Sequence, residues 1–202
     1  MRRWTLRRRR NSNPGWFFLK KGINYEAVFA IRNKIHLIFM KTITAVEQKI
    51  LSPEKLEGWL RSKRLTSKTI AFTNGCFDIL HEGHIFSLSQ AAKEADCLIV
   101  GVNSDASVTR LKGDHRPINN QHSRSLVLAS LLIVDAVITF DEDTPLELIK
   151  KVLPDVLVKG GDYTIDTTVG AKEVIANGGR VVINPIIPGF STSGLIEKIK
   201  SL

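Results

Sequence analysis

Apolar and polar positions along the chain fall into blocks whose period switches between helix and strand. The first clear block follows Ser52-Pro53, an N-cap residue and a proline at the first helical position. Leu56, Trp59 and Leu60 then recur on one helical face. This spacing predicts an amphipathic helix over residues 53–64.

Short apolar runs alternate with helical patterns from there to the end of the chain. The runs predict strands over residues 69–73, 97–102, 136–140, 155–159 and 180–184. The patterns between them predict helices over residues 84–94, 122–132, 145–152, 168–177 and 193–200. Strands that alternate with helices pair in parallel, with helices on both faces. We therefore expect an α/β fold, a Rossmann-like three-layer sandwich with a five-stranded parallel sheet.

Positive charge is concentrated at the start of the chain. Residues 1–39 hold ten Lys and Arg against one acid, Glu26, so they account for the whole net charge of +9. Residues 40–202 are neutral, and Met40 opens a segment that resembles an ordinary domain start. We expect residues 1–39 to be a basic N-terminal extension outside the functional domain, residues 40–202. Three interpretations of this extension are open: a mis-assigned start, a targeting segment or a functional arm.

Composition excludes several classes of protein. Hydrophobic residues make up 43% and charged residues 24%, which are globular values and argue against collagen or wholesale disorder. Two cysteines, Cys76 and Cys97, cannot form a four-cysteine zinc site. No stretch approaches the ~20 apolar residues of a membrane span. We therefore expect no membrane association.

The loop after the first predicted strand carries the chemistry, because ligands bind beyond the carboxyl ends of strands in such sheets. Residues 74–84 read NGCFDILHEGH, which matches neither G-x-G-x-x-G nor a P-loop. His81 and His84 stand at a helix start, where free N–H groups and the helix dipole favour phosphate. A metal site is the alternative, but no third ligand lies near in sequence.

Purely structural roles are alternatives for other residues of this loop. Cys76 can be a small packed residue rather than a nucleophile, and Asp78 can cap the turn. Gly75 and Gly83 can serve only to permit tight turns.

The run Thr73 to His84 resembles the motif of the cytidylyltransferase-like nucleotidyltransferases. Within that superfamily the chain is similar to bacterial D-glycero-β-D-manno-heptose 1-phosphate adenylyltransferases of the free-standing form. Three further stretches support this narrower match, at residues 102–113, 154–163 and 189–193. The resemblance covers roughly residues 45–202 and implies the HIGH-type nucleotidyltransferase fold.

The resemblance implies transfer of AMP from ATP to the heptose 1-phosphate, which yields ADP-heptose and pyrophosphate for lipopolysaccharide-type heptose precursors. It implies Mg²⁺ with ATP as the substrate and no metal site built from protein residues. A homodimer, a cytoplasmic location and a separate sugar kinase upstream are the further expectations. Positioning and electrostatic stabilisation should supply most of the catalysis.

The resemblance also assigns residues. The expected catalytic residues are His81, His84, Lys112 and Lys159, with Lys112 in a glycine-flanked loop and Lys159 at a strand end. The expected nucleotide-binding residues are Asn74, Gly75, Cys76, Phe77, Asp78, Gly83, Arg124, Asp162, Ser191 and Thr192. Ser191 to Ser193 can equally cap the last helix, Arg124 can serve an interface, and Asp105 can touch substrate or cap a turn.

Some positions depart from the family pattern. Glu82 stands where a small residue is common, His122 and Ser123 stand where an acid often precedes Arg124, and Phe190 is an uncommon neighbour of the Ser-Thr pair. Another family enzyme, such as a glycerol-3-phosphate cytidylyltransferase, is therefore an alternative. A nucleic-acid-binding module acting through the arm is a second, which the neutral domain argues against.

Overall fold

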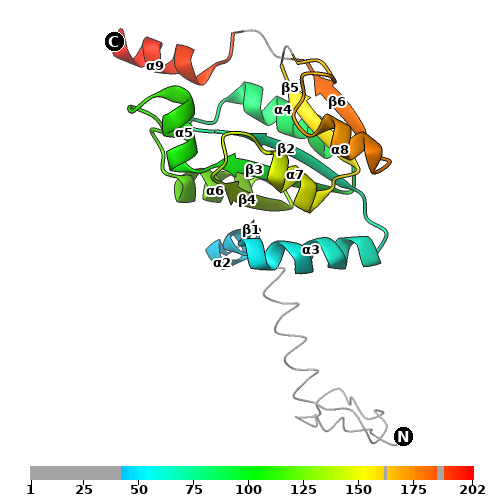
Figure 1. Cartoon of the computed structure of the whole chain (residues 1–202). Helices are drawn as coiled ribbons and strands as arrows, with labels where there is room; N and C mark the ends of the chain where they lie inside the picture. The colour runs from blue at the N-terminus through cyan, green and yellow to red at the C-terminus, as the bar shows by residue number, and fades with distance from the viewer. Residues whose placement is uncertain (1–41, 162, 186–188) are drawn as a thin grey trace, which may run out of the picture. The chain divides into compact units, whose positions relative to one another are not determined.

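The computed structural model describes residues 42–161, 163–185 and 189–202. Within them the chain forms a parallel sheet of six strands in the order β1-β4-β3-β2-β5-β6 (Figure 1). The expectations for residues 1–39 and for Asp162 lie outside the described residues. The strands are β1 (Ile50–Leu51), β2 (Ile70–Gly75), β3 (Cys97–Asn103), β4 (Ala136–Phe140), β5 (Val156–Gly160) and β6 (Arg180–Asn184).

The Rossmann-like parallel fold is confirmed, but the expected count of five strands is wrong. The five predicted strands all exist, with bounds within two residues of those expected. The sixth is β1, a two-residue edge strand that pairs Ile50 with Val137 and Leu51 with Ile138. It is too short to show a period, because Ser52 and Pro53 begin a helix directly after it.

Eight helices are present in the part of the chain that the structure describes. They are α2 (Ile43–Glu47), α3 (Pro53–Leu65), α4 (Glu82–Ala92), α5 (Asp105–Lys112), α6 (Gln121–Ser130), α7 (Leu146–Val152), α8 (Ala171–Ala176) and α9 (Thr192–Lys200). The six predicted helices match α3, α4, α6, α7, α8 and α9 to within three residues. None of the helices in these residues is long and apolar enough to cross a bilayer.

Helix α5 corrects the expectation that Lys112 lies in a loop, because Lys112 is the last residue of that helix. Ser104 caps its start by accepting a hydrogen bond from the Ser107 amide. Gly113 ends it with a φ of 95°, a left-handed value that favours glycine.

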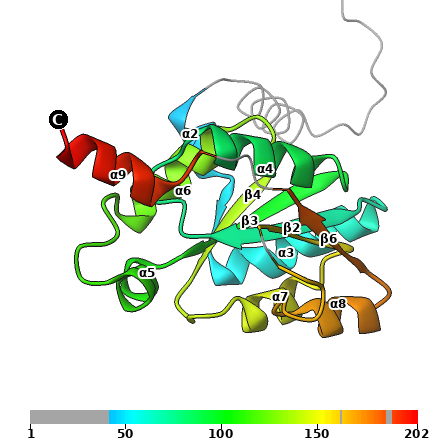
Figure 2. The ribbon, with the colours of Figure 1, turned by 90° about the horizontal axis from the view of Figure 1, so that it is seen from above.

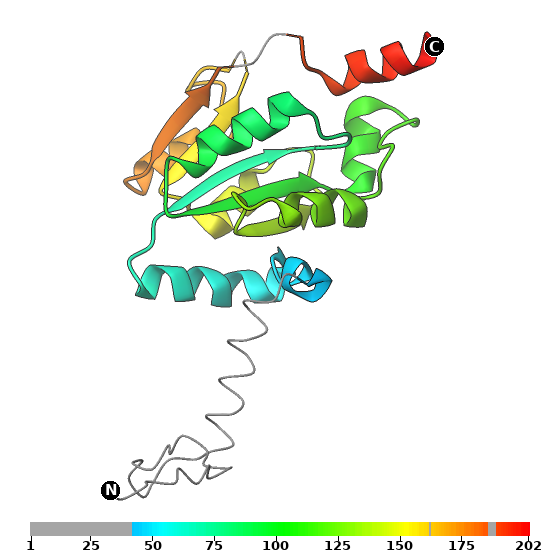
Figure 3. The same ribbon diagram turned by 180° about the vertical axis from the view of Figure 1, so that it is seen from behind.

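Two hydrophobic clusters, one on each face of the sheet, make the three layers. One joins α3, α7 and α8 to side chains such as Ile70 and Phe72, and the other joins α4 and α6 to Ala71 and Val100. Neighbouring residues of a strand point to opposite faces, so β2 contributes to both clusters. Figure 2 shows α4 and α6 above the sheet and α3, α7 and α8 below it, and Figure 3 shows α4 and α6 in front.

The strand order reverses between β2 and β5. From β2 the chain adds β3 and then β4 on one side, whereas β5 and β6 lie on the other. The β2–β5 ladder consists of only two residue pairs, Ala71 with Val156 and Phe72 with Leu157. Asn74 and Gly75 of β2 and Lys159 and Gly160 of β5 lie beyond the last pair. This switch point is where ligands bind in open parallel sheets.

Candidate functional site

A histidine pair marks the start of α4, at the carboxyl end of β2. His81 is the N-cap residue, and its carbonyl accepts hydrogen bonds from the amides of His84 and Ile85. The two imidazole rings stack, with centroids 3.8 Å apart and planes at 26°. The first N–H groups of a helix lack partners within the helix. Both rings therefore lie where an anion would find hydrogen-bond donors and a favourable helix dipole.

Aromatic side chains enclose the pair. The Phe77 ring lies 5.3 Å from the His84 ring, and the Phe190 ring lies 6.3 Å from the His81 ring, between ring centroids. Gly83 permits this packing, because a Cβ atom there would lie 3.1 Å from Cβ of Phe190 and 3.2 Å from the His81 ring. The loop after β2 and the segment before α9 thus meet at the histidines.

Burial makes both imidazoles harder to protonate. It lowers the pKa of His81, and it lowers the pKa of His84 to about 4, with the neighbouring His81 contributing further. The Nδ1 atoms of both rings are buried and have no hydrogen-bond partner. Buried polar atoms are normally paired, so both Nδ1 atoms have unused hydrogen-bonding capacity.

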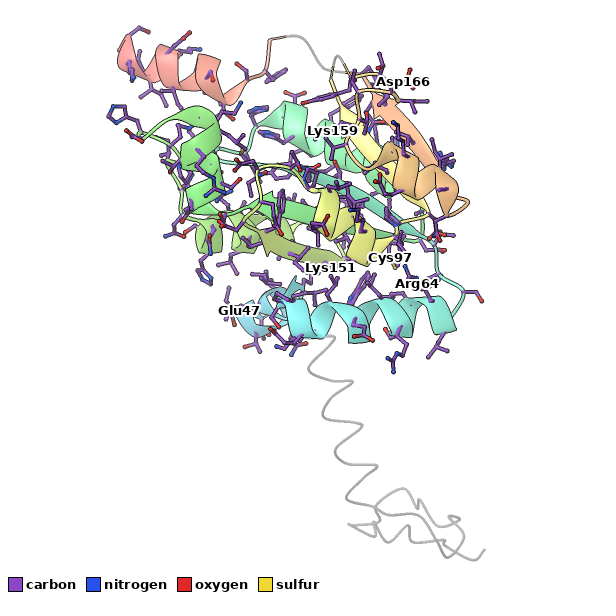
Figure 4. All side chains as sticks on the ribbon, in the orientation of Figure 1. Glu47, Arg64, Cys97, Lys151, Lys159 and Asp166 are labelled. Atoms are coloured by element: carbon purple, nitrogen blue, oxygen red, sulfur yellow. The ribbon has the colours of Figure 1, made fainter. Side chains whose placement is uncertain are left out.

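Lys159 faces this loop from the other side of the switch point. Its Nζ atom donates to Oδ1 of Asn74 at 3.1 Å and lies 5.2 Å from the centroid of the Tyr163 ring. Burial lowers the pKa of Lys159. Figure 4 labels Lys159 at the β5 end of the sheet. Because the Asn74–Lys159 contact joins the ends of β2 and β5, the switch point carries a lysine.

Asp78 contacts protein groups on both carboxylate oxygens. It accepts hydrogen bonds from the amides of Ile118 and Asn119 and from Nε of Arg116, the last at 2.5 Å. Burial raises the pKa of Asp78, but these hydrogen bonds and the Arg116 charge outweigh it and hold the pKa below the ordinary value. With only 3% of the residue exposed, Asp78 has little surface left for a ligand.

Arg124, like Asp78, binds protein groups. Its guanidinium donates to the carbonyls of Cys76, Asn103 and Asn119 and forms an ion pair with Asp105 at 2.8 Å. The residue is 2% exposed. Four of its five N–H donors are therefore occupied by the protein, which leaves little for the phosphates expected from the sequence.

The start of α9 lies against the histidine loop. Thr192 donates from its hydroxyl to the Ile79 carbonyl at 3.4 Å, and Ser191 caps the helix by accepting from the Gly194 amide. The capping role left open for Ser191 is therefore present, and the same hydroxyl can still meet an anion.

A large cavity lies apart from the histidine site. A cavity of about 960 Å³ lies between α3, β4 and α7, with Leu56, Phe140 and Leu148 among its lining, and it shares no residue with the histidine site. Figure 4 labels Arg64 and Lys151, which line it. Across the described ranges no three or more His, Cys, Asp and Glu side chains gather as a metal site would require.

The chain matches the family described as Cytidylyltransferase-like over residues 72–198, which include the histidine loop, Lys159 and α9 up to Lys198. The chain belongs to the cytidylyltransferase-like family. It is a nucleotidyltransferase, and the histidine pair at the switch point lies within the matched region.

Relatives of this cytidylyltransferase-like chain extend the comparison. The bifunctional protein HldE of Mesorhizobium japonicum is 51% identical over 158 residues, which cover 78% of this chain and 32% of that protein. HldE of Caulobacter vibrioides is 53% identical over 146 residues, or 72% of this chain and 29% of that protein. The chain thus spans about a third of the length of these curated relatives.

A solved structure supports the fold. The lipopolysaccharide core biosynthesis protein from Thermoplasma volcanium is 32% identical, with a TM-score of 0.50, and the match covers 59% of this chain and 97% of that one. The cytidylyltransferase-like domain therefore shares its architecture with a protein of that name.

The cytidylyltransferase-like site brings together only part of the predicted set. At the ends of β2 and β5 and around the start of α4 it places His81, His84, Phe77, Gly83, Asn74, Gly75, Lys159, Ser191 and Thr192. Asp78 and Arg124 bind protein groups, the Cys76 carbonyl accepts a hydrogen bond from Arg124, and Lys112 is exposed at the end of α5. The catalytic and binding roles of all of these stay predictions.

Sequence reasoning missed Arg116 and Asn119, the partners of Asp78. Their segment, residues 113–120, has no helical or strand period, and its contacts span about forty residues. Asn119 also donates from its side chain to the Asp78 carbonyl. The turn-rich composition of the segment was the one available signal, and it does not name a partner.

Proposed function

We propose that the domain transfers AMP from ATP to D-glycero-β-D-manno-heptose 1-phosphate and releases pyrophosphate. The observation that carries the proposal is the stacked histidine pair at the start of α4, with two unpaired buried Nδ1 atoms, across the switch point from Lys159. The HldE relatives and the lipopolysaccharide core biosynthesis protein support the choice of a heptose acceptor.

The reaction needs little acid–base chemistry. A phosphate oxygen of the sugar 1-phosphate forms the new bond to the α-phosphorus of ATP. The bond from that phosphorus to the α–β bridging oxygen breaks, and its electron pair leaves with pyrophosphate. Because the nucleophile is already an anion, the protein has to align two anions and stabilise the charge that shifts among phosphate oxygens.

The histidines suit that task as hydrogen-bond donors. A neutral imidazole donates from one nitrogen, and a phosphate that reaches the pair would also favour its protonated form. The α4 amides add donors at the same place. Lys159 brings a positive charge from the β5 side, and burial strengthens its attraction to phosphate. Lys112, exposed at the end of α5, is free to reach the triphosphate from a third side.

Mg²⁺ enters in this proposal with ATP. Magnesium is commonly held by substrate phosphates and one or two carboxylates rather than by a protein cage. Asp78 and Asp105 both bind protein groups, so in this proposal the ATP phosphates would hold the ion. The ion would neutralise phosphate charge, while the protein residues orient the nucleotide.

The setting of the reaction is also a proposal. A separate sugar kinase upstream of this reaction is expected from the family resemblance. A homodimer in the cytoplasm is the expected form, and both properties rest on the family resemblance.

A crossed pyrophosphate-release assay tests the proposal. ATP and CTP are each combined with heptose 1-phosphate, other sugar 1-phosphates and glycerol 3-phosphate. We expect release with ATP and heptose 1-phosphate. A strong preference for CTP with glycerol 3-phosphate would instead select a glycerol-3-phosphate cytidylyltransferase, the alternative within the same family.

A further inference from the structure

Helix α5 is attached to the histidine loop at both of its ends. At its start, the Asp105 carboxylate pairs with Arg124, whose guanidinium also binds the carbonyls of Asn103 and Cys76. Just beyond its end, residues 116–119 bind the Asp78 carboxylate through one guanidinium and two amides. Cys76 and Asp78 both belong to the loop that leads to the histidines.

The bonds at the far end are strong ones. The Asp78 side chain is 1% exposed and the Arg116 side chain 15%, so their ion pair is poorly screened by water. Hydrogen bonds to a carboxylate are about twice as strong as those between neutral groups. Asn119 adds a bond from its side chain to the Asp78 carbonyl at 2.7 Å, and Arg124 adds one to the Asn119 carbonyl at 2.9 Å. The two attachments therefore share residues and reinforce each other.

Lys112 lies between these attachments in the sequence. It ends α5, one residue before Gly113, and its side chain is exposed. Burial raises the pKa of the Cys76 thiol, and the positive charge of Lys112 opposes that rise. A long flexible lysine acts on a phosphate only if its backbone is held at a fixed place.

We propose that Asp78 and Arg124 are positioning residues, a two-point clamp that holds α5 against the histidine loop and thereby places Lys112 beside the nucleotide phosphates. The inference rests on the proposed function for the role of Lys112. Asp78 and Arg124 would then act through Lys112 and would not bind the nucleotide themselves.

A double-mutant cycle with Asp78→Asn and Lys112→Ala tests the clamp. Asparagine has one acceptor oxygen, so its NH₂ group would face a donor from Arg116 or Ile118. We expect Asp78→Asn alone to lower kcat/KM for the nucleotide about 10- to 100-fold, because small misplacements are costly. In the Lys112→Ala background the same change should cost less than about twofold, since the group it positions is already gone.

Two further variants keep the test decisive. Arg116→Gln removes the charge partner of Asp78 at a partly exposed position, and it should show the same dependence on Lys112 even if Asp78→Asn fails to fold. Asp143→Asn is the matched control, because Asp143 pairs with Arg110 of the same helix at 2.7 Å but on the exposed side. It should change kcat/KM by less than about twofold.

Amide hydrogen exchange supplies an independent readout. The Ile118 and Asn119 amides donate to Asp78, so their exchange should speed up in Asp78→Asn and stay unchanged in Asp143→Asn. Two results would overturn the clamp. One is that the Asp78→Asn and Lys112→Ala changes lower kcat/KM by factors that simply multiply in the double variant. The other is that Asp78→Asn and Arg116→Gln both keep parental kinetics. The cycle uses whichever nucleotide supports pyrophosphate release, so a preference for CTP would contradict the proposed function while the cycle still decides the clamp.

Discussion

The imidazoles of His81 and His84 stack at a centroid distance of 3.8 Å, and each leaves its buried Nδ1 atom without a hydrogen-bond partner. Two stacked rings at this distance repel each other strongly if both become imidazolium ions. Burial also lowers the pKa of both rings, so the arrangement costs stability when protons are abundant.

Stability should fall as the pH drops from about 6.5 to about 4. In that window His84 of the unfolded chain binds a proton, whereas folded His84 stays neutral because its pKa is about 4. The unfolded state then holds more protons, so acid favours unfolding. We expect a loss of about 1–3 kcal/mol from this group. Denaturant unfolding at pH 7.5 and pH 4.5 measures it.

The matched variant for this test is His84→Gln, whose side chain does not titrate. Its unfolding free energy should depend less on pH across the same window. Equal pH dependence in the parent and His84→Gln would show that burial of His84 does not penalise its proton.

Removing either histidine should affect turnover more than nucleotide affinity. The charge on the transferring phosphate shifts in the transition state, where a fixed donor counts most. We expect His81→Ala and His84→Ala each to lower kcat by about 10²–10³ with a smaller change in ATP affinity. Steady-state kinetics and thermal melts of the same preparations measure this.

His122→Ala is the control for the histidine variants, because His122 is exposed on α6. It should keep parental kinetics. If the His81 and His84 variants instead melt far below the parent and retain turnover, the pair is structural, and the phosphate site rests on Lys112, Lys159 and the start of α9.

Lys159→Ala should lower kcat/KM by about 10²-fold, since it removes a partly buried positive charge from the switch point. Asn74→Ala should have a smaller effect, because Asn74 acts by holding the Lys159 ammonium at 3.1 Å. Combining the two changes should cost no more than Lys159→Ala alone. Lys151→Ala, at the cavity beside α7, is the control and should match the parent.

Gly83→Ala should impair catalysis with little effect on folding. The added Cβ would press on Phe190 and the His81 ring, and the partly exposed Phe190 can yield. Alanine also favours the helix, which offsets part of the strain. We expect kcat to fall about tenfold, because kcat depends on the position of the His81 ring. The free energy of unfolding should change by less than about 1 kcal/mol.

Gly58→Ala is the paired substitution in α3, where a Cβ meets nothing within 4 Å. It should raise stability by about 0.5–1 kcal/mol and leave kinetics unchanged. A Gly83→Ala protein with parental kcat would show that His81 tolerates the displacement.

Most of the fold was predictable because buried parallel strands consist of apolar runs such as Cys97–Asn103, and helices repeat at 3.6 residues. Helix α5 was not predicted, although Ser104 is a suitable N-cap residue. The helix has eight residues, and its only large apolar residues are Val108 and Leu111, which are too few to show a helical period. The histidine pair was visible as a local motif. The partners of Asp78 and Arg124 were not, since they depend on contacts between segments about 20 to 50 residues apart.

In the proposed reaction, a phosphate oxygen of the sugar 1-phosphate attacks the α-phosphorus of ATP. The most direct measurement follows the label from α- or γ-labelled ATP during turnover with heptose 1-phosphate. We expect the α-label in the sugar nucleotide and the γ-label in pyrophosphate. A γ-label that appears on the sugar, or an α-label that stays in ADP or AMP, would contradict the account.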